Sequence, residues 1–253
     1  MPINADYIRD LLENRYELYN QLSFIDTDPI SIPHRFSSKA DIEIAGLLTA
    51  LISWGRRKAI IDAANNMMGL IDHDPYNFVM HHEKSDLAPL CKFVYRTFNG
   101  NDLINSIKAL QHIYIKYEGL ENIFTHNSGI FGGLVEFRRI VLQLHHERRF
   151  EKHIANVAGG AAAKRLNMFL RWMVRNDRRG VDFGIWTNIS ASQLYIPLDV
   201  HTGQVARKMQ LLTRNANDWK AVLELTSTLG TFDPDDPVKY DFALFGLGVF
   251  EDF

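Results

Sequence analysis

One carboxylate in this chain lies where a side chain is well placed to act on a ligand, at the change from an extended segment to a helix. Apolar residues alternate from Leu194 to Leu198, and helical spacing at i, i+4 and i+7 begins at Val205. The period therefore changes near Asp199, which is predicted to lie at or near a helix N-cap. A carboxylate there can accept a backbone amide, a purely structural role. It can also take up a proton or stabilise a developing positive charge.

A second candidate segment carries small residues before a helix. Gly159 and Gly160 are adjacent and are followed by three alanines and then by Lys164 and Arg165. Small residues at a helix start allow close approach of the backbone to a phosphate, which the amides and the helix dipole would hold. A plain structural turn is the alternative. Three cations are predicted to lie along one side of the helix, in position for phosphate contacts: Lys164, Arg171 and Arg175.

Other motifs favour structure over chemistry. Two His-His-Glu runs, at 81–83 and 145–147, contain metal-ligand residue types. Neighbouring residues on a helix point about 100° apart, so neither histidine pair chelates as an i, i+4 couple would. We expect surface histidines, no metal and no cofactor. Residues 233–237 are predicted to form a capping turn. The Gly246-Leu247-Gly248 run predicts close helix packing, because it lacks the strand and third glycine of a dinucleotide site.

Charge is unevenly distributed along the 253 residues. The net charge is −2, yet residues 138–179 hold eleven Lys and Arg against three acidic residues, which gives +8 and leaves −10 elsewhere. A basic stripe on an otherwise acidic protein is expected of a phosphate-binding face. A solvated helix pair is the alternative.

Composition narrows the class of protein. With 46% hydrophobic residues the chain can bury a sizeable core without stabilising cross-links such as disulfides. The single cysteine, Cys91, excludes an intrachain disulfide and a four-thiolate iron-sulfur cluster. No apolar run approaches the roughly 20 residues that span a bilayer, and the polar N-terminus is unlike a signal peptide. We therefore expect a cytoplasmic protein with no membrane contact.

Helical periodicity dominates the chain and predicts a nearly all-α protein. The breaks fall where Pro, Gly and Asx residues cluster, and none is long enough to be a domain linker. The predicted helical segments are 7–22, 42–68, 103–117, 130–144, 166–174, 219–229 and 240–250.

Two stretches of the chain carry a resemblance to a known superfamily. The stretch from Pro197 to Arg207, with Asp199 and His201, resembles the Asp-x-His segment that carries the catalytic aspartate of the helix-hairpin-helix (HhH-GPD) DNA glycosylases, such as endonuclease III and the 8-oxoguanine glycosylases. Residues 41–53 are similar to the buried helix that opens their barrel, with Trp54-Gly55-Arg56 where relatives have a Gln and a Thr. The whole chain most resembles an uncharacterised bacterial family that is distantly similar to these enzymes.

The resemblance implies a two-lobed helical HhH-GPD glycosylase-like fold, with the chemistry in a cleft between the lobes. Residues 40–178 would form a barrel lobe that ends in the DNA-gripping hairpin, and residues 1–39 would join 179–253 in a second lobe. The region from 81 to 150 has little likeness to the superfamily, and its role is open.

The resemblance also implies roles for single residues. Lys164 would attack the sugar C1′, and Asp199 would stabilise the oxocarbenium-like sugar or deprotonate the attacking group. A phosphate-binding lysine is the alternative. The glycosylase pattern and the basic segment together predict nucleic-acid contacts at Gly159, Gly160, Arg165, Arg171, Arg175, His201, Arg207, Trp54 and Arg56.

Function is expected to be base excision on duplex DNA, by a glycosylase with or without lyase activity. The protein would contact the phosphate backbone and hold a flipped base between apolar walls. A non-catalytic nucleic-acid-binding protein on a glycosylase scaffold is the alternative, and an RNA-directed protein is a third class, because phosphate contacts do not reveal the sugar.

Overall fold

The computed structural model describes residues 5–125, 129–251 and 253. These residues are mostly helical, and their one sheet is the two-stranded antiparallel hairpin of β1 (Val94–Tyr95) and β2 (Phe98–Asn99). The all-α prediction is confirmed at this level. Among the helices described, none combines the length and the apolar character needed to cross a bilayer.

The chain divides into two compact units. The first joins Met1–Phe24 to Asn156–Phe253, and the second is Ile25–Ala155. These boundaries differ from the predicted ones at 40 and 178. The segment from 156 to 178 belongs with the C-terminal residues, because arginines of its helix pair with carboxylates of the C-terminal part of the chain. Such long-range charge pairing cannot be read from periodicity.

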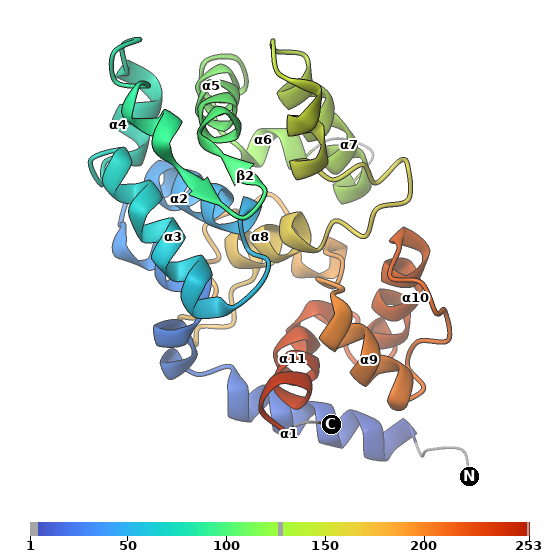
Figure 1. Ribbon diagram of the computed structural model, residues 1–253. Coiled ribbons are helices and arrows are strands. Elements are labelled where there is room, and N and C mark those ends of the chain that lie inside the picture. The colour runs from blue at the N-terminus through green and yellow to red at the C-terminus, as the bar shows by residue number, and fades with distance from the viewer. Residues whose placement is uncertain (1–4, 126–128, 252) are drawn as a thin grey trace. The chain divides into compact units, whose positions relative to one another are not determined.

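The first unit is built on two helices from distant parts of the chain, α1 and α11, which lie side by side (Figure 1). Helix α9 packs against α11 as well. The unit contains α1 (Ala5–Tyr19), α8 (Lys164–Val174), α9 (Val200–Lys208), α10 (Trp219–Gly230) and α11 (Tyr240–Phe250).

Glycines of α11 bring its neighbours close. A Cβ on Gly246 would collide with the Tyr19 ring of α1, and one on Gly248 would lie 3.1 Å from a methyl group of Val205 in α9. Close approach of helices needs small residues at the contact. The prediction that these glycines serve helix packing is confirmed.

The second unit surrounds a buried helix, α2, on which several neighbours pack. It contains α2 (Lys39–Leu51), α3 (Arg57–Leu70), α4 (Pro75–His81), α5 (Gly100–Tyr117), α6 (Glu121–Phe124), α7 (Gly129–Leu142) and the β1–β2 hairpin. Every residue of α2 from Ile42 to Leu51 is buried, as expected for residues 41–53. The predicted helix 42–68 is in fact two helices, because Gly55 adopts a φ of +105° between them.

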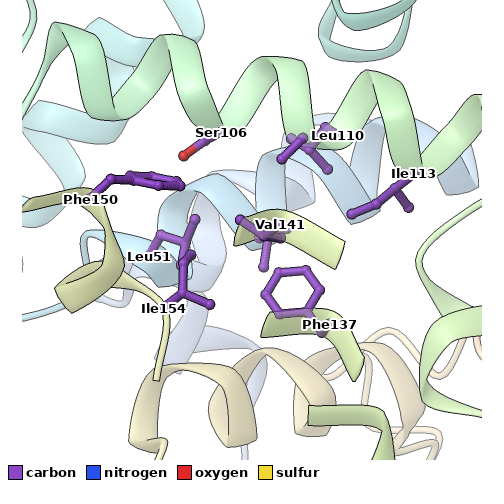
Figure 2. Close-up of a pocket in the computed structure, with 10 residues that line it drawn as sticks. Leu51, Ser106, Leu110, Ile113, Phe137, Val141, Phe150 and Ile154 are labelled. Atoms are coloured by element: carbon purple, nitrogen blue, oxygen red, sulfur yellow. The ribbon is translucent and has the colours of Figure 1, made fainter. Parts of the chain in front are cut away.

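An apolar hollow of about 220 Å³, including solvent at its mouth, lies inside the second unit between α2, α5 and α7. Figure 2 shows Leu51, Leu110, Phe137 and Val141 around it, with the Ser106 hydroxyl as the polar group among the labelled residues. That hydroxyl donates to the Asp102 carbonyl at 2.8 Å and is therefore satisfied. The hollow is a packing defect of the core.

Filling the hollow should stabilise the protein. Val141→Ile adds one methylene at its wall, and we expect the free energy of unfolding to rise by about 0.5–1 kcal/mol. Urea unfolding of the variant measures this. The matched control is Val222→Ile, since Val222 is fully buried in α10 and does not line the hollow. There the added methylene should be destabilising. Equal effects of the two changes would contradict the prediction.

Candidate functional site

A lysine and an aspartate from the starts of two helices come together in the first unit. Lys164 begins α8 and Asp199 precedes α9. Lys164 Nζ lies 3.9 Å from Asp199 Oδ2, and the two side chains are 27% and 25% exposed. At this distance the pair attracts without a direct hydrogen bond, and both groups remain partly open to solvent. The two residues for which the sequence predicted a chemical role therefore lie close together.

Asp199 is the N-cap of α9, as predicted. Its Oδ1 accepts the Thr202 amide at 2.9 Å, which leaves Oδ2 facing Lys164. Asn217 Nδ2 donates to the Asp199 carbonyl at 3.0 Å. The cap and the ion pair thus use different oxygens. Structural and chemical roles for Asp199 are compatible, because the cap fixes the carboxylate without occupying it fully.

Arg207 holds Asn217, the residue that donates to the Asp199 carbonyl. Its Nη2 donates to Asn217 Oδ1 at 2.6 Å, and its Nε donates to the Arg214 carbonyl at 2.8 Å. A Cβ on Gly203 would lie 2.7 Å from that Asn217 oxygen, so glycine leaves room for the contact. Arg207 was predicted to contact nucleic acid. The structure instead directs these donors to the chain itself, whereas His201 is exposed on α9.

The predicted phosphate-binding turn uses its own amides. The Gly159 amide donates to the Asn156 carbonyl at 3.1 Å, and the Gly160 amide donates to the Val157 carbonyl at 2.9 Å. Gly160, with a φ of +91°, makes the turn and its carbonyl accepts the Trp219 amide at 2.9 Å. Neither glycine amide points outward to hold a phosphate, which corrects the prediction. The element before the turn is a 3-10 helix, 148–153.

Helix α8 starts directly after this turn. Its N-cap, Ala163, has a φ of 50° and no capping side chain. Lys164 Nζ lies 3.5 Å from Met168 Sδ, one turn along the helix. The neighbouring Arg165 is partly buried, and burial lowers the pKa of its guanidinium to about 10. Arg165 therefore stays charged at neutral pH.

Arg171 and Arg175 are buried, which corrects the prediction that they bind phosphate. They do share one side of α8, but that side faces carboxylates of the same unit. Arg171 Nη1 donates to Asp241 Oδ2 at 2.5 Å, and Arg175 Nε donates to Asp236 Oδ2 at 2.7 Å. Asp182 bridges both guanidinium groups. Buried charges need such partners, so these arginines are committed to the core.

The rest of the basic segment is largely neutralised as well. Several of its arginines pair with acidic residues in and around it, so the +8 of residues 138–179 does not form a free cationic stripe. These pairs are Arg138–Glu151, Arg139–Glu136, Arg149–Asp102 and Arg179–Glu17.

Sequence reasoning missed one carboxylate of this region, Asp241. It is buried near the start of α11 and feels the charges of both Asp199 and Lys164. Burial raises the pKa of its carboxyl to about 6, although the positive charge of Arg171 opposes the shift. A signal was present in the sequence, because Asp241 is a lone acid in the otherwise apolar segment 240–250.

Asp241 should make stability depend on pH. Its pKa is about 6 in the folded protein and about 3.9 when unfolded, so the stability that its protonation provides is lost as the pH rises between those values. Asp241→Asn removes the titration. The difference in free energy of unfolding, variant minus wild type, should rise by on the order of 2–3 kcal/mol between about pH 4 and pH 7. Urea unfolding across this range tests it, and parallel pH profiles would refute it.

Trp54 and Arg56 lie in the second unit, in the loop between α2 and α3. The Trp54 indole is partly exposed and stacks on the His153 ring, with centroids 6.0 Å apart. Arg56 is exposed, and within the described ranges no carboxylate pairs with it. Both side chains are thus accessible, as a binding role requires.

The described chain is a mostly helical protein in which the starts of two helices hold a Lys-Asp pair. Residues 28–250 match the family model described as Protein of unknown function (DUF2400), and the chain belongs to that family. Comparison with curated proteins and with solved structures gives no match.

Proposed function

We propose that this protein binds duplex DNA and acts in base excision, as a DNA glycosylase with lyase activity centred on Lys164 and Asp199. The observation that carries the proposal is the 3.9 Å approach of Lys164 Nζ to Asp199 Oδ2. Asp199 lies in the segment that resembles the catalytic segment of the HhH-GPD glycosylases, and the same resemblance implies the role of nucleophile for Lys164. An amine beside a carboxylate, each partly exposed, is a pair suited to attack on a sugar carbon.

The chemistry needs no group beyond this pair and the substrate. Asp199 Oδ2 accepts a proton from the Lys164 ammonium, and the neutral amine attacks C1′ of the damaged nucleotide. The bond between C1′ and the base breaks, and the base leaves with the electron pair and takes up a proton. If the base leaves before the amine attacks, Asp199 is still charged and stabilises the positive charge that develops on the sugar. The C1′–O4′ bond then breaks as O4′ takes the proton held by Asp199, and the attached nitrogen gives up one proton to the departed base. The product is a Schiff base between Lys164 and the opened sugar.

The experiment is incubation of the protein with duplexes that each carry one damaged base, followed by alkali. Alkali cleaves any abasic product, so base loss is detected even when Lys164 is inert. Borohydride in a parallel set reduces a Schiff base and leaves protein covalently attached to DNA. Nicking of one duplex, with a trapped adduct, supports the proposal. Intact duplexes throughout, with DNA binding retained, would overturn it in favour of a non-catalytic nucleic-acid-binding protein.

A further inference from the structure

A loop and a hairpin from distant parts of the second unit are tied together by one hydroxyl. The loop is Trp54–Gly55–Arg56 between α2 and α3, and the hairpin is β1–β2. Tyr95 of the hairpin donates its hydroxyl to the Trp54 carbonyl at 2.7 Å, and the two rings meet edge to face at 5.6 Å. The position of the loop is therefore set by the hairpin.

The same hydroxyl holds a cation over the loop. Arg96, at the tip of the hairpin, is hydrogen-bonded to the Tyr95 hydroxyl. Burial raises the pKa of that hydroxyl, and the charge and hydrogen bond of Arg96 oppose the rise. Arg96 has a φ of 54°, as the tight turn requires. A Cβ on Gly55 would collide with the Arg96 guanidinium, so the guanidinium lies across the loop only because residue 55 is glycine.

Further cations come from the start of α3. Arg56 and Lys58 are exposed, and Lys58 pairs with Asp62, which is also exposed, at 2.8 Å. Within the part of the chain that the structure describes, no carboxylate pairs with Arg56 or Arg96. This contrasts with the basic segment 138–179, where several arginines are paired or buried. Arg56 and Arg96 therefore lie outside residues 138–179, the segment that the count of charges favoured.

We infer that the loop-hairpin surface, formed by Trp54, Arg56, Lys58 and Arg96, binds the sugar-phosphate backbone of a nucleic-acid strand. Guanidinium groups match phosphate oxygens in a two-pronged geometry, and the partly exposed indole of Trp54 offers an aromatic contact to a sugar or base. The surface lies wholly within the second unit and requires nothing of Lys164 or Asp199. The inference rests on the duplex binding of the proposed function, names the surface that would hold the strand, and can be tested apart from base release.

The test measures fluorescence anisotropy of a labelled short DNA duplex with the whole protein, from about 50 to about 200 mM salt. Arg56→Ala/Arg96→Ala should weaken binding about tenfold or more at the lower salt and reduce the salt slope by about two. The matched control, Lys84→Ala/Lys108→Ala, removes the same charge from exposed positions of the same unit outside the surface. It should change the affinity by less than about twofold.

A charge-neutral variant separates placement from net charge. Tyr95→Phe removes the hydroxyl that holds Trp54 and Arg96, and it should weaken duplex binding while circular dichroism remains native. Absence of duplex binding by the wild type, or equal losses in the arginine and lysine pairs, would overturn the inference. So would binding of phosphatidylserine vesicles, in place of DNA, through Arg56 and Arg96. This assay does not measure base release. A protein that releases no base would therefore still give a valid result for the loop-hairpin surface.

Discussion

Asp199→Asn should lower base release by about 10²–10⁴-fold, because the amide can neither accept the Lys164 proton nor stabilise positive charge on the sugar. The folded state should be nearly unaffected. Asn caps helices about as well as Asp, so the Oδ1 bond to the Thr202 amide is retained and the free energy of unfolding should change by less than about 1 kcal/mol. Single-turnover nicking on the responsive duplex, together with urea unfolding, measures both quantities.

The chain contains a close match for use as a control. Asp218 caps α10 with the same extended backbone, and its Oδ1 accepts the Ala221 amide at 3.1 Å. Asp218→Asn should leave base release unchanged. Lys164→Met should abolish the borohydride-trapped adduct. If Asp199→Asn and Asp218→Asn were equally active, Asp199 would be a helix cap without a chemical role.

Arg175→Met should lower the free energy of unfolding by about 3–5 kcal/mol. Arg175 is 1% exposed. Its guanidinium contacts the carboxylates of Asp236, Asp182 and Asp177 at 2.7, 3.1 and 2.9 Å. Methionine fills much of the same volume but carries no charge, so these carboxylates would lose their common counter-ion. Urea unfolding at neutral pH measures the loss, with the transition followed by circular dichroism.

A nearby arginine in a more open setting provides the control. Arg179 pairs with Glu17 at 2.5 Å, but the Glu17 side chain is 59% exposed. Exposed pairs contribute little, so Arg179→Met should cost less than about 1 kcal/mol. A loss at Arg175 as small as that at Arg179 would show that the buried carboxylates find other partners or protonate.

Much of the helical architecture could be predicted, because periodicity reports which face of an element is buried. The α8, α10 and α11 helices lie where apolar spacing placed them, and the change of period found the N-cap at Asp199. Two short helices, α4 and α6, gave no pattern, since they are too brief for a repeat to develop. Apolar spacing ran the segment 42–68 through Gly55, because the spacing resumes at Ile60, whereas the resemblance ended the buried helix at residue 53.

The site was harder to predict, because its charges are paired across long sequence separations. Spacing put Arg171 and Arg175 on one side of a helix, yet whether that side faces solvent depends on Asp236 and Asp241 from the C-terminal segment. The mutual approach of Lys164 and Asp199 followed from resemblance, and no local pattern required it. Arg96 was not considered, because its position over Gly55 depends on a hairpin contact between distant segments.

The pairing of α1 with α11 has a consequence for biosynthesis. Translation at roughly 5–20 residues per second means that α1 leaves the ribosome roughly 10–50 s before α11 is complete. During that interval the apolar side of α1, with Ile8, Leu12 and Tyr16, lacks the surface that buries it in the folded unit. Residues 25–155 form a compact unit of their own and can fold in the meantime. The nascent chain therefore exposes these three apolar side chains until the C-terminal helix has been made.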